Sequence, residues 1–90
     1  MSAIFTAELR RDVATDSYYV LIIAWGEWER DTNACEWDVT EYSGPLTESQ
    51  LAYVRDTRHT SQLDWSEELP EGWDAWEQIE TIWADVGGEP

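Results

Sequence analysis

Residues 63–85 constrain the fold of this chain more than any other stretch, because they combine large aromatic rings with dense negative charge. They hold four of the seven tryptophans and eight carboxylates, with no lysine or arginine. A folded chain must bury the rings and leave the carboxylates in water, since an unpaired buried charge is costly. At about 100° per residue, Trp76, Ile79 and Trp83 share one side of a helix. The spacing therefore predicts an amphipathic C-terminal helix with an acidic outer edge.

The net charge of the whole chain is far from zero. Twenty Asp and Glu residues stand against five arginines, lysine is absent, and the formal net charge is −15. A small domain needs only about 2–8 net charges to stay soluble. Over the roughly 31 Å span expected for a globule of this length, the chain carries about one charge per 2 Å. Duplex DNA carries one per about 1.7 Å, so the domain is expected to resemble a nucleic acid in charge, and its sign excludes direct nucleic-acid binding.

Length and composition predict a single acidic domain that spans residues 1–90. The chain is 42% hydrophobic and 13% aromatic, which is too apolar for a disordered acidic tail. Cys35 is the only cysteine, so no intrachain disulfide is expected, and the N-terminus lacks a signal-peptide pattern. The longest apolar run, residues 18–25, is too short to cross a bilayer. These features favour a cytoplasmic protein without membrane contact.

Alternating and β-branched residues predict three strands, at 4–10, 18–29 and 35–42. Short polar connectors join them, which is typical of an antiparallel meander. Its inner face is expected to carry three apolar residues: Trp28, Trp37 and Val39. Its outer face is expected to carry four acidic residues: Glu27, Glu29, Glu36 and Asp38.

Helix signals follow the third strand. Thr47 is a suitable N-cap and Gln50 stands three residues later, which together form a capping-box sequence for a helix that ends near Arg58. Asp64 and Glu67 have the spacing of a second, shorter helical turn. With the C-terminal helix, the predicted fold class is α+β: a three-stranded antiparallel meander followed by two to three helices packed on one face.

Carboxylates at regular spacing are the candidate functional groups. Residues two apart on a strand are about 6.6 Å apart, and residues three or four apart on a helix have Cβ atoms about 5–6 Å apart. If the sheet face and the helix edge join, these acids form two rows that resemble the phosphates of a groove. The candidate partner-binding residues are Glu27, Glu29, Asp31, Glu36, Asp38, Glu41, Glu67, Glu68, Glu71, Asp74 and Glu77.

Seven tryptophans are too many for one small core, and tryptophan is a favoured interface residue. By periodicity Trp37, Trp76 and Trp83 are expected in the core. Trp65 and Trp73 flank Pro70 and are expected to be partly exposed, where they either pack their loop onto the domain or contact a partner.

Catalytic chemistry has little support in the sequence. His59 is the only histidine, and no spacing supplies it with a serine or cysteine partner. Cys35 lies on the predicted inner face, where an inert buried thiol is expected. Residues 31–33 resemble the start of a calcium loop, but the required glycine and final glutamate do not follow. Paired acids could serve glycoside hydrolysis, but so short a chain leaves no room for a deep cleft. We therefore expect no enzyme activity, no cofactor and no metal.

A small acidic chain with three strands, then helices, and no catalytic signature resembles phage-encoded anti-CRISPR proteins of the DNA-mimic type, particularly those that act on the type I-C surveillance complex. The resemblance covers the overall character of the whole chain. No motif carries it, so no family site residue is transferred. It implies an inhibitor in the cytoplasm of a bacterial host that occupies a basic DNA-binding surface of a CRISPR effector complex and blocks target recognition.

Two other interpretations remain open at this point. An immunity protein or antitoxin that neutralises a basic nuclease toxin would use the same electrostatics with a different partner. An ordinary domain of a halophile would also be acidic and poor in lysine. Seven tryptophans do not serve solvation, however, which counts against the halophile interpretation.

Overall fold

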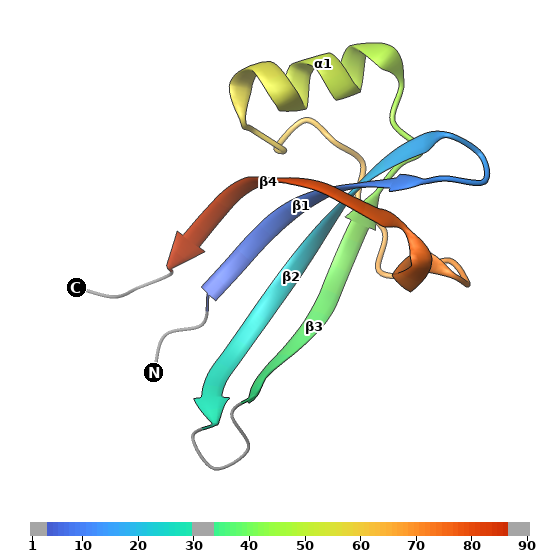
Figure 1. Ribbon diagram of the computed structural model, residues 1–90. Coiled ribbons are helices and arrows are strands. Elements are labelled where there is room, and N and C mark those ends of the chain that lie inside the picture. Colours follow the sequence, from blue (N-terminus) through green and yellow to red (C-terminus); the bar gives the residue numbers. More distant parts are fainter. Residues whose placement is uncertain (1–3, 30–33, 87–90) are drawn as a thin grey trace.

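A computed structural model of the chain describes residues 4–29 and 34–86, apart from the side chains of residues 27–29, 34–36 and 86. Its elements are listed here in chain order: β1 (Ile4–Asp12), β2 (Ser17–Glu29), β3 (Ala34–Ser43), α1 (Glu48–Thr57), a 3₁₀ helix (Trp73–Ala75) and β4 (Glu77–Val86). The strands form one antiparallel sheet in the order β3-β2-β1-β4 (Figure 1). The C-terminal strand therefore lies beside the N-terminal strand, and β3 and β4 are the two edges.

The predicted fold class is wrong in its second half. The first three predicted strands are present as consecutive antiparallel neighbours, but residues 77–86 form a fourth strand, and α1 is the one α-helix of the described chain. Residues 64–67, expected to begin a helical turn, contain only an isolated bridge from Ser66 to Tyr42. The fold is thus dominated by a sheet, with helical structure confined to α1 and one 3₁₀ turn.

Two β-bulges explain why β4 resembles a helix in sequence. Its register with β1 shifts twice, so that Ile79 and Ile82 are extra residues on the β4 side. Each bulge lengthens the repeat of side chains on one face from two residues to three. A strand with two bulges therefore places apolar residues three and four apart, which is also the helical period. Residues 77–86 form a strand because they pair with the edge of β1 that β2 leaves free, and a sequence pattern does not reveal that edge.

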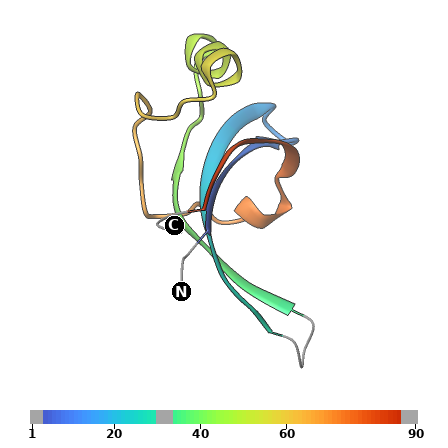
Figure 2. The same cartoon turned by 90° about the vertical axis from the view of Figure 1, so that its left-hand side faces the viewer.

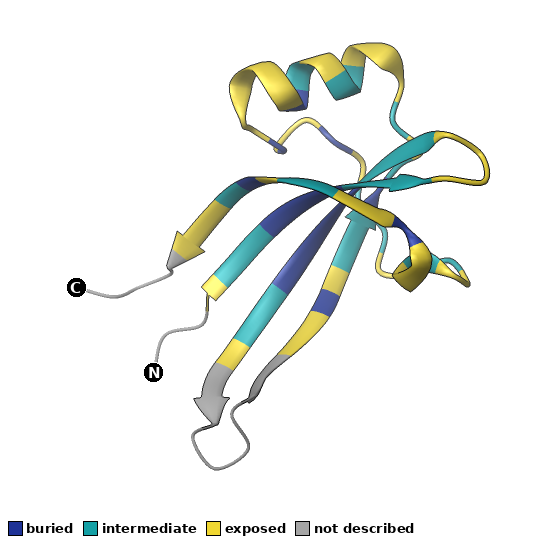
Figure 3. Cartoon of the chain, in the orientation of Figure 1, coloured by how far each residue is buried: buried dark blue, intermediate teal, exposed yellow. Residues whose placement is uncertain are grey.

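Apolar residues pack on both faces of the sheet. On the helix face, which α1 covers, the buried cluster comprises Ala7, Leu9, Val20, Ile22, Val54, Leu63 and Ile82. On the opposite strap face, the buried cluster comprises Leu21, Ile23, Val39 and Trp76. Figure 2 shows α1 on one side of the sheet and the segment before β4 on the other. Figure 3 shows that burial is concentrated in the middle of β1 and β2.

The segment that joins α1 to β4 wraps around the β3 edge, and we call residues 64–77 the acidic strap. Near its start, Trp65 packs against the helix-face cluster. The backbone of Ser66 then exchanges two hydrogen bonds of 2.9 Å with Tyr42 on β3. Beyond this bridge, Trp73 packs on the strap face. The strap thus covers part of an edge that would otherwise be open to pairing with another chain.

The predicted start of α1 is confirmed. The Thr47 side chain accepts a hydrogen bond from the Gln50 backbone at 3.1 Å, and the Gln50 side chain accepts one from the Thr47 backbone at 2.9 Å. At the other end, Arg55 donates to the Glu80 carboxylate at 3.0 Å, and Arg58 donates to the same carboxylate. These pairs connect the end of α1 to β4.

Substituting Glu80→Gln tests this connection. Partial burial opposes ionisation of Glu80, but hydrogen bonds and positive charge from Arg58 and Arg55 outweigh it and hold its pKa below the ordinary value. Because the folded-state pKa is the lower one, the stabilisation is present above the ordinary Glu pKa and is lost as pH falls through the lowered pKa. We expect the substitution to reduce the free energy of unfolding at neutral pH by under about 1 kcal/mol, since the pairs are near the surface.

Urea unfolding at a series of pH values measures the effect. Glu77→Gln is the matched control, because Glu77 is exposed on the same strand and forms none of the ion pairs seen in residues 4–29 and 34–86. The difference between Glu80→Gln and wild type should shrink toward zero on acidification. A difference that is the same at every pH would contradict a role for the ionised form of Glu80.

Candidate functional site

The acidic strap carries a group of exposed carboxylates and contains no basic residue. All six of its acids are exposed: Asp64, Glu67, Glu68, Glu71, Asp74 and Glu77. The strap passes from the β3 edge, where Ser66 bridges to Tyr42, to the strap face, where Trp76 is buried (Figure 2). The last five belong to the candidate set predicted from the sequence. These five lie on one continuous segment of the chain, and all five are exposed.

Aromatic packing holds the backbone of the acidic strap in place. Trp76 is 8% exposed, and its ring stacks on Tyr19 with 3.9 Å between centroids and 12° between planes. Tyr42 lies against the same indole, with centroids 6.4 Å apart. Trp73 packs edge-on against Trp37, with centroids 6.3 Å apart and planes at 89°. Because Trp73 and Trp76 both have packing partners, the backbone that carries the neighbouring carboxylates is held against the sheet.

The positive charges of the described chain are used elsewhere. Each of its four arginines pairs with a carboxylate outside the candidate set. The pairs are Arg10 with Glu8 at 2.9 Å, Arg11 with Asp16 at 3.1 Å, Arg55 with Glu80 at 3.0 Å, and Arg58 with Glu80. Arg30 lies outside the described residues. Within residues 4–29 and 34–86, the acidic strap is therefore not neutralised by an arginine.

The remaining candidate residues are not part of this segment. Asp38 is exposed and Glu41 is half-buried, and their pairing with Ala24 and Ile22 puts both on the helix face of β3. The other four candidates, Glu27, Glu29, Asp31 and Glu36, lie outside the residues whose side chains are described. The expected helix edge carrying Asp74 and Glu77 does not exist, because that segment is a 3₁₀ turn followed by a strand.

The charge density expected for a globule also needs correction. The molecule is elongated, with a longest axis of 42 Å, so fifteen net charges over 42 Å give about one per 2.8 Å. This charge density is lower than that of duplex DNA, which carries one charge per about 1.7 Å. The molecule as a whole therefore falls short of the charge density of a duplex.

The tryptophans follow the sequence expectation only in part. Trp76 is buried, and Trp65 and Trp73 are half-buried as expected, each packed against one of the two clusters. Trp37, expected in the core, is 48% exposed. The reason is its place on the edge strand β3, where it packs against Trp25 and Trp73 but lies away from the point at which the strap crosses at Tyr42. Cys35, expected as a buried thiol, lies outside the described side chains.

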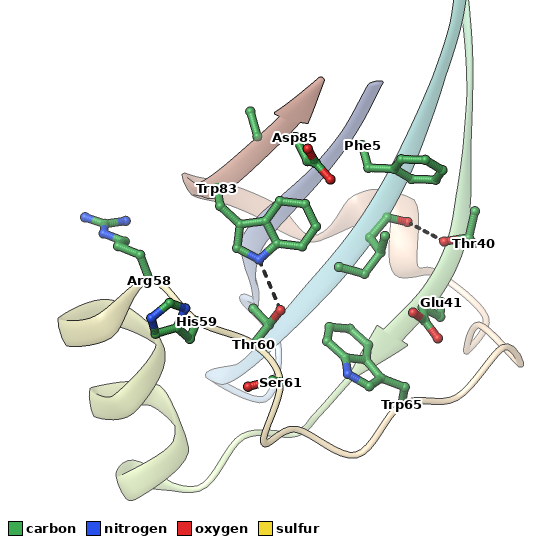
Figure 4. A pocket seen from close by; sticks show the side chains of 12 residues that line it. Phe5, Thr40, Glu41, Arg58, His59, Thr60, Ser61, Trp65, Trp83 and Asp85 are labelled. Carbon is green, nitrogen blue, oxygen red and sulfur yellow. Dashed lines mark hydrogen bonds between the residues drawn. The ribbon is translucent and has the colours of Figure 1, made fainter. Parts of the chain in front are cut away.

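A groove on the helix face is a feature that sequence reasoning missed. It has a volume of about 770 Å³ and lies between the sheet and the chain that follows α1 (Figure 4). Trp65 and Trp83 supply its aromatic walls, Phe5 lies in its floor, and the Trp83 indole donates a hydrogen bond of 3.1 Å to the Thr60 hydroxyl. Its lining comes from all four strands and from residues 58–65, so no local spacing in the sequence could have revealed it.

Several kinds of site are not seen in the part of the chain that the structure describes. Its His, Cys, Asp and Glu residues include no group of three placed to hold a metal ion. None of its helices has the length and apolar character needed to cross a membrane. Comparison with protein-family models, with curated proteins and with solved structures found no match to this chain. The functional interpretation therefore comes from the chain's own residues.

Proposed function

We propose that this protein is a non-catalytic inhibitor that mimics nucleic-acid charge and occupies a basic, DNA-binding surface of a partner protein. The observation that supports this function is the acidic strap, whose six exposed carboxylates are held by packed tryptophans and left unpaired by the described arginines. The resemblance to anti-CRISPR proteins implies the partner: a CRISPR effector complex in the cytoplasm of a bacterial host. Binding there would block target-DNA recognition.

The physical basis of the proposed inhibition is complementarity with a lysine- and arginine-lined channel. A fixed row of negative charge steers a positive surface toward it and raises the association rate by about 10–1,000-fold. Because the row is ordered before binding, less conformational entropy is lost when the complex forms. Half-buried Trp73 of the strap and exposed Trp37, which packs against it, supply apolar contact, which slows dissociation.

A competition experiment tests the proposal. Immobilised effector complex with its guide RNA is saturated with target duplex, and the protein is added at increasing concentration. We expect the protein to displace the duplex competitively, so that its apparent affinity falls in proportion to the concentration of duplex. We also expect its association rate to fall by about tenfold or more when salt rises from about 50 to about 200 mM, because the steering charges are screened.

A ternary complex of effector, duplex and protein would contradict competition for one surface. A basic nuclease toxin, assayed in parallel, provides the second arm. If the protein binds the toxin tightly and in a salt-sensitive way but does not bind the effector, the partner is a nuclease rather than a CRISPR complex. An association rate that does not depend on salt would contradict charge mimicry for either partner.

A further inference from the structure

The groove on the helix face crosses the whole sheet. Its floor takes one residue from each strand: Glu41 from β3, Ile22 from β2, Phe5 from β1 and Asp85 from β4. Trp65 and Trp83 form walls above this floor (Figure 4). The volume of about 770 Å³ lies within the roughly 300–1,000 Å³ that is usual for ligand pockets. The groove is therefore large enough to hold several side chains of another molecule.

Carboxylates lie toward both ends of the groove, and aromatic rings lie between them. Glu41 belongs to one edge strand and Asp85 to the other, and neither forms one of the ion pairs seen in the described chain. The one arginine of the lining, Arg58, is paired with Glu80, and its guanidinium lies on the side away from Glu41 and Trp65 (Figure 4). Planar cations bind well where carboxylates and aromatic faces occur together, and the arginine guanidinium is the protein group with that shape.

The separation of the two edge strands indicates the spacing of the cations. Three inter-strand steps of about 4.8 Å place β3 and β4 roughly 14 Å apart. The cross-strand row of Glu41 passes through Ala7 and that of Asp85 through Phe5, an offset of two residues or about 6.6 Å along the strand, so the two backbone positions are about 16 Å apart. In an extended chain, side chains at positions i and i+4 point the same way and are about 13 Å apart. One cation cannot reach both carboxylates, whereas two arginines four residues apart in an extended segment can.

We propose that the groove binds an extended basic segment of the partner protein, with guanidinium groups on Glu41 and Asp85 and with Trp65 and Trp83 stacked against them. The inference rests on the proposed function in taking the partner to be basic, and it adds a second contact surface on the face opposite Trp73. The strap would meet the DNA-binding channel, while the groove would hold an arginine-bearing loop beside that channel.

A peptide titration followed by NMR tests the groove without the effector complex. The probe is acetyl-Gly-Arg-Ser-Ser-Ser-Arg-Gly-amide, added to the ¹⁵N-labelled full chain, and the indole N–H signals of the tryptophans report its position. We expect saturable shifts at Trp65 and Trp83. The same peptide with citrulline for arginine, which is neutral and nearly isosteric, should bind about tenfold or more weakly. A peptide with adjacent arginines should also bind more weakly.

Matched variants separate the groove from general attraction to an acidic protein. Glu41→Gln with Asp85→Asn should weaken peptide binding by about tenfold or more. Glu48→Gln with Asp56→Asn removes the same two charges from exposed positions on α1 and should leave binding near wild type. Asp85 is exposed, so Asp85→Asn alone provides a variant that keeps the fold and should show part of the loss.

Four outcomes would overturn the inference. Equal weakening by both double variants would show unspecific attraction, and shifts confined to Trp25, Trp37 or Trp73 would place the cation on the strap face. If free arginine amide binds as tightly as the two-arginine peptide, the groove is a site for a small molecule and not for an extended segment. If the peptide does not bind but the protein still displaces the duplex from the effector complex, only the groove proposal is contradicted. If the peptide binds but the protein does not displace the duplex, only the proposed function is contradicted.

Discussion

Reversing two charges on the acidic strap, Glu67→Lys with Glu71→Lys, is expected to lower affinity for the partner by about 100-fold or more. Both side chains are exposed and unpaired among the described residues, so each would turn an attraction to a basic surface into a repulsion. A 100-fold change corresponds to about 2.8 kcal/mol. The association rate at low salt should account for much of the loss, because these charges act before contact is made.

Glu48→Lys with Asp56→Lys is the matched control for that variant. Both positions are exposed on α1, on the helix face, and the pair changes the net charge from −15 to −11 just as the strap pair does, since two reversals add two charges each. Surface plasmon resonance compares the two proteins, and circular dichroism checks that both are folded. If both variants bind equally weakly, the partner responds to total charge and the strap is not a specific surface.

Trp76→Ala is expected to have the largest effect on stability. The indole is 8% exposed, stacks on Tyr19 and lies against Tyr42, so its removal leaves a cavity between the strap and the sheet. Truncation of a buried tryptophan reduces the free energy of unfolding by about 3–5 kcal/mol. That is a large part of the about 5–15 kcal/mol that stabilises an ordinary domain. The strap should also lose its fixed position, so partner binding should weaken in whatever folded protein remains.

Urea unfolding measures this loss, with Trp37→Ala as the comparison. Trp37 is 48% exposed, and its removal should reduce the free energy of unfolding by under about 1 kcal/mol. If Trp76→Ala does not fold, Trp76→Phe keeps an aromatic ring on Tyr19 and should show a smaller, measurable loss. Equal losses from Trp76→Ala and Trp37→Ala would contradict the view that Trp76 anchors the strap.

The charge-reversed strap and Trp76→Ala are both expected to weaken partner binding, and both expectations depend on the fixed position of the strap. The proposed charge mimicry requires the strap carboxylates to keep a fixed arrangement. Trp76 is the residue that anchors the strap to the sheet, because it stacks on Tyr19 and is buried in the strap-face cluster. Loss of affinity in Trp76→Ala should therefore appear in the dissociation rate and in the heat capacity of binding, since the strap must now be ordered in the complex. Loss of affinity in the charge-reversed strap should appear mainly in the association rate.

Local features of the chain were predictable because their causes are local. Alternating residues placed β1, β2 and β3, and Thr47 with Gln50 placed the start of α1. Neither conclusion needed knowledge of distant contacts. The negative charge of residues 64–77 was equally evident, since composition alone shows that no basic residue lies among them.

The C-terminal strand, the path of the strap and the groove were decided by tertiary structure. Two bulges gave β4 the residue spacing of a helix, and only the free edge of β1 selected a strand instead. The bridge from Ser66 to Tyr42 took the strap around the β3 edge, which left Trp37 exposed and grouped the carboxylates without a helix. Glu41 and Asp85 lie far apart in sequence and share one groove because antiparallel pairing aligns all four strands. Such contacts depend on which chain segments meet across the sheet, and a residue pattern along the chain does not contain that information.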